Sequence, residues 1–144
     1  MDNVVLLAVD GSAGSDRALD HALKRAKTAG SKLVIAFVIE WSPYTFNTPE
    51  ENAQRHERRE AEIDRANEMV VVPALARVTG EGIEAEGVVR HGQPAETLIR
   101  LARDHNAAQI VIGRRGQGGL KSLIFGSVAG NLIQTAPVPV VVVP

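Results

Sequence analysis

The sequence predicts an α/β domain: a single open, parallel, five-stranded β-sheet with helices on both faces. Short apolar runs rich in β-branched residues recur along the chain, and amphipathic helical patterns separate them. Strands that helices cover on both faces read as continuous apolar runs. Regular alternation of strand and helix indicates parallel strands joined by right-handed crossovers. We therefore expect one Rossmann-like domain over residues 1–144.

The predicted strands are bounded by turn residues. The first run ends at Asp10 and Gly11, and the fourth, a short one, ends at Gly113. The third is weaker and more alternating, whereas the last is almost all valine from Val138 to Val143. Short runs bounded by glycine and proline are typical of strands. We expect strands over residues 4–9, 33–39, 83–89, 109–112 and 138–143.

Three helices are predicted with clear ends. Residues 15–29 carry an apolar stripe at helical spacing, with acidic residues early and basic residues late, which suits the helix dipole. Gly30 is a natural stop for this helix. Pro94 is well placed to begin a helix over residues 94–106. A third helix, over residues 127–135, lies between Gly126 and Pro137.

The segment over residues 50–79 is ambiguous. Its first half is highly charged, with pairs such as Glu51 and Arg55 at helical spacing, and its second half contains three consecutive valines. Propensity alone favours a strand for those valines. We predict one long helix that is kinked or interrupted near Pro73, because proline removes a backbone donor and clashes with the preceding turn. The stretch over residues 41–49, which is rich in breakers, is predicted as a loop.

Composition argues against several functional classes. The chain has 144 residues and no cysteine, which excludes disulfides and thiolate metal sites. Its net charge of −1 and few aromatic residues do not favour nucleic acid or an anionic membrane as a partner. No apolar run approaches the ~20 residues of a membrane span, and the first residues lack the basic region of a signal peptide. We expect a cytoplasmic protein without membrane insertion.

The segment from Gly113 to Ser127 is the best candidate for ligand binding. It is rich in glycine and ends where a helix is predicted to begin. Glycine lets a ligand approach the bare backbone, successive backbone N–H groups can form a nest for anions, and the first N–H groups of a helix have no partner. In an open parallel sheet such a loop lies at the carboxyl ends of the strands, where ligands bind. A surface loop with turn glycines is the alternative interpretation.

Two common phosphate motifs are excluded in this segment. Lys121 and Ser122 match the end of a P-loop, but Leu120 stands where that motif requires glycine. Neither glycine-rich loop spells the Gly-x-Gly-x-x-Gly fingerprint of dinucleotide-binding domains.

Several motifs, in order along the chain, resemble the universal stress protein family. Gly113, Gly116, Gly126 and Ser127 match the Gly-x2-Gly-x9-Gly-Ser/Thr motif of its ATP-binding members. The first strand ends in Val-Asp-Gly-Ser, a Gly-x-Pro turn precedes the helix at Pro94, and the chain closes on a Pro-Val-Pro-Val strand. The matches cover nearly the whole chain.

The resemblance implies a sheet in the order 3-2-1-4-5, with ATP, ADP or AMP bound at the ends of strands one and four. It implies that Asp10 contacts the ribose or an attendant Mg²⁺ and that Val38 or its immediate neighbour presents its backbone to adenine. Backbone N–H groups would meet the phosphates. The nucleotide-binding residues expected on this basis are Asp10, Gly11, Val38, Gly113, Arg114, Gly116, Gln117, Gly118, Gly126, Ser127 and Val128.

The sequence departs from the family pattern at two places. Family members often have proline where Ala8 stands, and Ser-His-like residues where Arg114 and Arg115 follow Gly113. The two arginines either add charge for a triphosphate or face solvent. The four histidines form no catalytic pattern, and only His91 lies near the expected ligand edge.

Three functions remain open from the sequence. The first is a nucleotide-dependent regulatory or stress-response module, favoured because a phosphate cradle is present without an evident catalytic base. The second is a slow Mg²⁺-dependent ATP hydrolase, and the third a homodimeric interaction protein that ignores nucleotide. The resemblance implies a homodimer through the last strands, which would cover an all-valine edge. Pro139 suits an edge strand because it cannot donate to a ladder. The protein partner is not identified by the sequence.

Overall fold

The computed structural model describes residues 3–40, 49–114 and 127–144. Five parallel strands form one sheet in the order β3-β2-β1-β4-β5, which confirms the predicted α/β fold and strand order. The strands are β1 (Val4–Ala8), β2 (Lys32–Glu40), β3 (Ala85–Gly92), β4 (Ala107–Gly113) and β5 (Val140–Val143).

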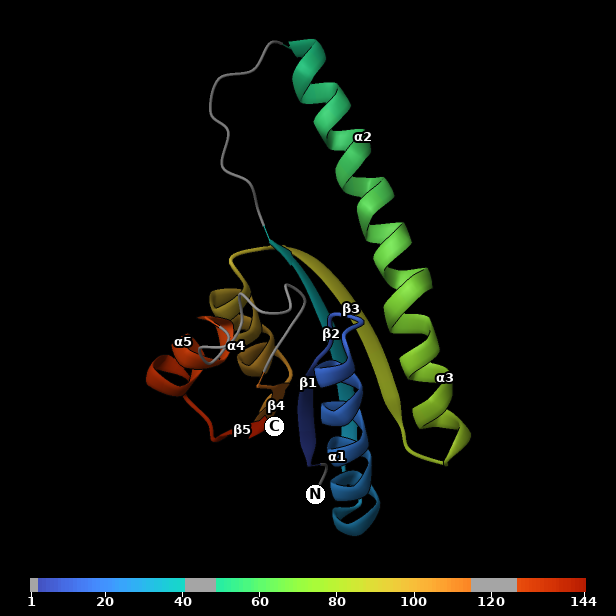
Figure 1. Cartoon of the computed structure of the whole chain (residues 1–144), viewed down its shortest axis with the longest axis vertical. Helices are drawn as coiled ribbons and strands as arrows, with labels where there is room; N and C mark the ends of the chain where they lie inside the picture. The colour runs from blue at the N-terminus through green and yellow to red at the C-terminus, as the bar shows by residue number, and fades with distance from the viewer. Residues whose placement is uncertain (1–2, 41–48, 115–126) are drawn as a thin grey trace.

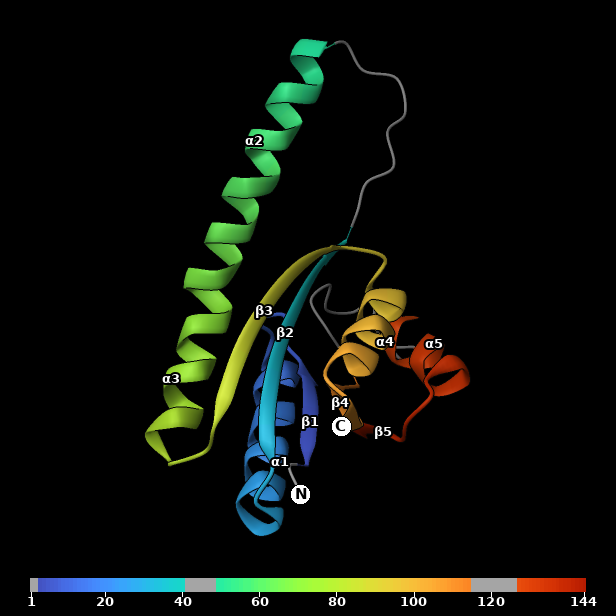
Figure 2. The same ribbon diagram turned by 180° about the vertical axis from the view of Figure 1, so that it is seen from behind.

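Helices cover both faces of the sheet (Figure 1 and Figure 2). One face carries α1 (Ala13–Ala29) and a long helix made of α2 (Pro49–Ala66), the π-helical turn η1 (Asn67–Val71) and α3 (Val72–Gly80). The other face carries α4 (Pro94–Asp104) and α5 (Ser127–Thr135). Of the helices in the described ranges, none combines the length and apolar character that crossing a membrane requires.

Alternate residues of the central strands supply the two apolar cores. Leu7 and Ile35 face α1 and α3, whereas Leu6 and Val34 face α4. All four side chains are fully buried. Because side chains alternate across a strand, a strand covered on both faces must be apolar at every position. This explains the continuous apolar runs that predicted β1 and β2.

Caps fix the ends of α1 and α4. Ser12 is the N-cap of α1, and its hydroxyl accepts a hydrogen bond from the backbone N–H of Ser15 at 3.1 Å. Gly30 ends α1 in the left-handed conformation, with φ of 68°, as predicted. Gln93 caps α4 through its side-chain oxygen, 2.7 Å from the backbone nitrogen of Glu96, and Pro94 follows at the first helical position.

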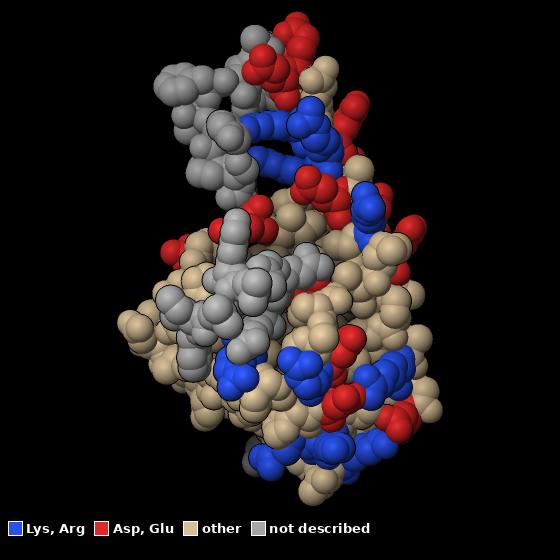
Figure 3. Space-filling model, viewed as in Figure 1, with Lys and Arg blue, Asp and Glu red and all other residues tan. Residues whose placement is uncertain are grey.

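The long helix is interrupted directly before Pro73, as the sequence predicted. The backbone N–H of Val72 bonds to the carbonyl of Asn67, five residues back, which is π-helical spacing. Proline has no N–H and its ring crowds the preceding turn, so a wider turn accommodates it. The three valines of this region are therefore helical. The upper part of α2 projects beyond the sheet as an arm that carries charges of both signs (Figure 3).

Some boundaries differ from the predicted ones. β4 begins two residues earlier than expected, at Ala107, and β3 is shifted toward Gly92. β5 begins only at Val140, so that Val138 and Pro139 precede the strand. α4 ends at Asp104, and Pro49, expected in the loop, is the first residue of α2. The rest of that predicted loop lies outside the described residues.

Gly87 of β3 allows the long helix to lie close to the sheet. A Cβ atom at this position would collide with Cγ1 of Val71 and lie 2.9 Å from Cδ1 of Leu75. Both neighbours belong to the helix that covers β3, and Val71 is fully buried. A larger residue at position 87 would therefore push η1 and α3 away from the strand.

We predict that Gly87→Ala lowers the free energy of unfolding by about 1–3 kcal/mol, because overpacking a close interface costs this much. The matched control is Gly80→Ala, where a Cβ atom meets nothing within 4 Å. Alanine there should leave stability unchanged or slightly raised. Urea denaturation followed by circular dichroism measures both. Equal stabilities for the two variants would contradict the packing role of Gly87.

Candidate functional site

A cavity of about 410 Å³ opens at the carboxyl ends of β1, β2 and β4. This is the point where the strand order reverses. From β1 the chain runs to β2 and β3 on one side, and it then crosses through α4 to β4, on the other side of β1. Ligands of open α/β sheets bind at this switch point. The lining residues come from β1 and its turn, the end of β2, α4, the end of β4 and the start of α5: Ala8, Val9, Asp10, Ser15, Ala36, Phe37, Val38, Ile39, Glu40, Pro94, Leu98, Ile112, Gly113, Ser127, Val128 and Ala129.

One end of the cavity is apolar. Ala36 and Val38 lie on the strand face that meets α4, which contributes Pro94 and Leu98. Ala36 and Leu98 are almost fully buried, whereas Val38 is partly exposed. Most small-molecule sites are lined in this way, with apolar walls and a few polar groups that fix orientation. This end suits a flat, apolar part of a ligand.

The turn between β1 and α1 forms a polar wall. Oδ1 of Asp10 accepts hydrogen bonds from the backbone N–H of Ser12 at 2.9 Å and from its hydroxyl at 2.5 Å. The backbone N–H of Asp10 donates to the hydroxyl of Ser15 at 3.1 Å. Ser15 is buried. The turn is thus fixed by its own side chains, which orients the Asp10 carboxylate before any ligand arrives.

The first turn of α5 closes the polar end of the cavity. Ser127, Val128 and Ala129 are the first three residues of this nine-residue helix, and all three line the cavity. Their backbone N–H groups lack intrahelical partners and carry partial positive charge. Gly113, at the end of β4, lies beside them in the lining. This end of the cavity is suited to an anionic group.

The charged lining is acidic. Asp10 and Glu40 are the charged side chains that the described part of the chain contributes to the cavity. His91 does not line it, although it lies near the end of β3, where its Nε2 is 2.9 Å from Oε2 of Glu62. An anion bound here would depend on backbone N–H groups, the α5 dipole and any bound cation.

The structure brings together five of the residues predicted as a binding site: Asp10, Val38, Gly113, Ser127 and Val128. Two others are placed elsewhere. Gly11 has a φ of 81° and lines a separate hollow on the opposite face. Arg114 is exposed, and its backbone N–H donates to the carbonyl of Val143 at 2.7 Å. The predictions for Gly116, Gln117, Gly118 and Gly126 fall outside the described residues.

Sequence reasoning missed Ser15 and most of the apolar lining. α4 contributes Pro94 to the cavity lining, and the sequence had indicated only that Pro94 begins a helix. Ala36, on β2, and Ala129, on α5, are small residues at an edge where larger ones would fill the cavity. Alternation along β2 could have shown that Ala36, Val38 and Glu40 share one face. Nothing local in the sequence places Leu98 beside them.

Comparisons with known proteins agree with this architecture. A model of the universal stress protein family matches residues 1–144. A universal stress protein of Thermus aquaticus is 33% identical over 144 residues, covering 99% of each chain. The structure of UspA from Lactobacillus plantarum superposes with a TM-score of 0.86 at 23% identity, covering 99% of this chain and 97% of that one.

A further neighbour was solved with a nucleotide. It is the universal stress protein from Archaeoglobus fulgidus in complex with dAMP, with a TM-score of 0.67 at 24% identity, covering 100% of this chain and 98% of that one. The family match over the whole length, together with the shared fold, shows that this chain belongs to the universal stress protein family.

Proposed function

We propose that this chain is a nucleotide-dependent regulatory module that binds ATP, ADP or AMP in the cavity between β1, β2 and β4. The supporting observation is a cavity with two chemically different ends at the switch point of the sheet. Its volume, about 410 Å³, falls within the range of roughly 300–1,000 Å³ that small-molecule sites occupy. A structural neighbour in complex with dAMP adds support from the same family.

The ligand is oriented by the contrast between the two ends. Adenine enters between the end of β2 and α4, against Val38 and Leu98. The ribose then lies beside Asp10, whose fixed carboxylate accepts a hydrogen bond from a hydroxyl. The phosphates reach the first turn of α5, where backbone N–H groups and the Ser127 hydroxyl donate to them. Gly116, Gln117, Gly118 and Gly126 extend this phosphate site in the proposal.

Magnesium belongs to the proposal because the charged lining is acidic. Asp10 and Glu40 repel a triphosphate, and a cation chelated by ATP offsets this repulsion. Asp10 is the side chain placed to contact that cation. In this scheme Mg²⁺ matters more for ATP than for AMP, because ATP carries more phosphate charge.

The first prediction separates phosphate binding from helix stability. Ser127→Glu puts a carboxylate at the phosphate end but suits the positive end of α5. We expect it to weaken Mg-ATP binding at least about tenfold, roughly 1.4 kcal/mol, while adenosine binds as it does to the wild type. Isothermal calorimetry measures both ligands, and thermal unfolding confirms that the variant is folded.

The control for this experiment is Gln134→Glu, the same change of charge at the exposed last turn of α5. It should leave Mg-ATP affinity unchanged. Absence of calorimetric heat and of thermal stabilisation with ATP, ADP and AMP in the wild type would refute nucleotide binding. Unaltered Mg-ATP affinity in Ser127→Glu would refute the placement of the phosphates.

The second prediction concerns the cation. Chelating Mg²⁺ with EDTA should weaken ATP binding roughly tenfold and change AMP binding little. Titrations of both nucleotides, with and without EDTA, measure the difference. If the two nucleotides lose affinity equally, the cation acts on the protein and not on the triphosphate.

The proposal includes a homodimer formed through β5. The carbonyl of Pro139, directly before β5, accepts a hydrogen bond from the backbone N–H of Ile110 in β4, and the carbonyl of Val143 accepts one from Arg114, directly after β4. Because bonding direction alternates along a strand, the backbone groups of Val140 and Val142 point toward the outer edge. Among the described residues β5 pairs only with β4, so this edge is available to a second copy. Pairing would cover a short all-valine strand that otherwise invites aggregation.

Val142→Pro tests the dimer because it removes an outward N–H group without removing a hydrogen bond to β4. We expect sedimentation velocity to show a shift from dimer to monomer, with the dissociation constant of the dimer raised at least about tenfold. Val142→Thr, which keeps the N–H group and a branched side chain, should remain dimeric. A wild-type monomer at high protein concentration, or an unaffected Val142→Pro dimer, would disprove pairing through β5.

A further inference from the structure

A second hollow, of about 310 Å³, lies on the opposite face of the sheet from the nucleotide cavity. Its lining comes from the end of β1, the start of α1 and the long helix, and both helices cover the same face of the sheet (Figure 1). We propose that this hollow docks a segment of a partner protein that inserts one apolar side chain beside a lysine or arginine. Its lining residues are Val9, Gly11, Ser15, Asp16, Leu19, Met69, Val70, Pro73, Ala74 and Arg77.

The hollow has an apolar floor. Val9, Leu19 and Ala74 are 6%, 4% and 8% exposed, so they belong to the core and not to a mobile surface. Val70, from the π-helical turn, packs against this core and forms part of the wall. The hollow, at about 310 Å³, has room for a large apolar side chain. Such buried anchors carry most of the binding energy of protein interfaces.

Met69, which lines the hollow, is an exposed apolar side chain. It is 68% exposed, and Val72, further along the same helix but not among the lining residues, is 47% exposed. In the described part of the chain the other large apolar side chain with comparable exposure is Ile133, on a different face. Methionine adapts its shape and is common on surfaces that bind varied partners. Figure 3 shows a largely uncharged surface between the start of α1 and the long helix.

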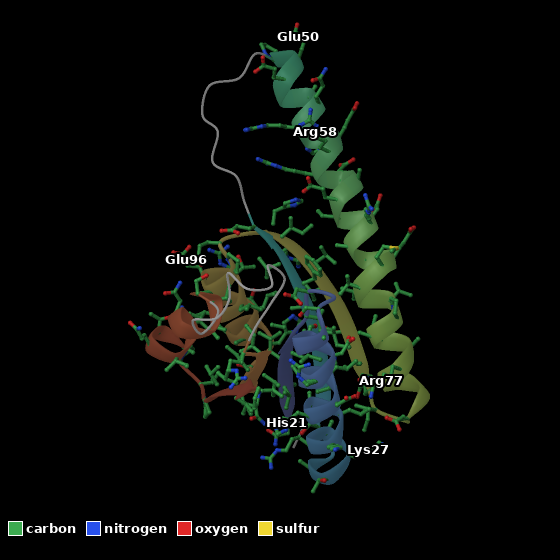
Figure 4. All side chains as sticks on the ribbon, viewed as in Figure 1. His21, Lys27, Glu50, Arg58, Arg77 and Glu96 are labelled. Atoms are coloured by element: carbon green, nitrogen blue, oxygen red, sulfur yellow. The ribbon has the colours of Figure 1, made fainter. Side chains whose placement is uncertain are left out.

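Two ion pairs join α1 to α3 and to the residue that follows α3. Arg77 pairs with Asp20, and Lys27 pairs with Glu81 at 2.9 Å. Arg77 and Lys27 lie toward the lower ends of α3 and α1 in Figure 4. These contacts fix the two helices together below the hollow. Away from these ion pairs, the hollow is lined by the start of α1 and by the π-helical turn.

The charge of the rim favours a basic partner. Asp16 lies at the mouth, is exposed, and has no side-chain partner within the described ranges. The charge of Arg77 is already met by Asp20. Along the long helix, Arg65 and Glu68, two residues of opposite charge, lie near Met69 in the sequence. A carboxylate therefore remains beside an apolar pocket, which complements a lysine or arginine next to an apolar residue.

Methionine labelling gives a direct test, because the chain contains only two methionines, Met1 and Met69. The full chain carries ¹³C-methyl methionine, and the probes are short peptides of leucine and alanine with either lysine or glutamate. We expect the lysine peptide to shift the Met69 methyl signal in a saturable way. The Met1 signal should stay unchanged. The glutamate peptide should bind at least roughly fivefold more weakly.

Asp16→Lys is the decisive variant. It should weaken the lysine peptide roughly fivefold and strengthen the glutamate peptide by a similar factor, because exposed charge pairs contribute on this scale. Asp104→Lys makes the same change of charge at the exposed end of α4 on the other face, and should change neither affinity. Asp16 and Asp104 are both exposed at the surface, and thermal unfolding checks that the two variants fold.

Three outcomes would overturn the proposal. The Met69 signal would not respond to the lysine peptide. Alternatively, the two peptides would bind equally well to the wild type and to Asp16→Lys, which indicates unspecific apolar contact. Finally, the Met69 signal would shift with protein concentration alone, which assigns the face to a second copy of this chain. None of these measurements requires nucleotide, so they are independent of the proposed nucleotide binding.

Discussion

Burial of β1 on both faces is the constraint on which the rest of the structure depends. Val5, Leu6 and Leu7 are at most 1% exposed, and β1 pairs with β2 on one side and with β4 on the other. The chain continues from β1 to β2 on one side and returns to β4 on the other side of β1. The helices α1 and α4 consequently cover opposite faces of the sheet. The carboxyl end of β1 is left between them, and the cavity forms there.

Strands that are apolar on both faces were predicted accurately from the sequence. Strand ends that depend on backbone pairing alone were predicted less well. β1 and β2 are apolar at nearly every position, and their patterns sufficed. The last residues of β3, Arg90, His91 and Gly92, are polar or lack a side chain, yet they pair with Val38, Ile39 and Glu40. Ala107 joins β4 through its pairing with Val4. Backbone pairing leaves no periodicity in the sequence, so these extensions could not be predicted from it.

The residues of the candidate site also divide into those that the sequence identified and those that only tertiary packing brings together. Gly113 and Ser127 were predicted from a glycine-rich segment that ends at a helix start, and Asp10 was predicted from the resemblance to the family. Leu98 and Ser15 were not, because tertiary packing alone brings them to the cavity. Adjacent residues can also separate: Asp10 faces the cavity, whereas Gly11, with its left-handed backbone, lies in the hollow on the other face. A motif therefore identifies the region of a site more reliably than its individual contacts.

Val9 and Ser15 line both the cavity and the opposite hollow. The two spaces thus share part of their walls, and the hydrogen bonds of Asp10, Ser12 and Ser15 hold this shared part in place. Any occupant that displaces this wall enlarges one compartment at the expense of the other. Since coupling between two sites acts equally in both directions, molecules that displace the wall in opposite senses compete without ever touching.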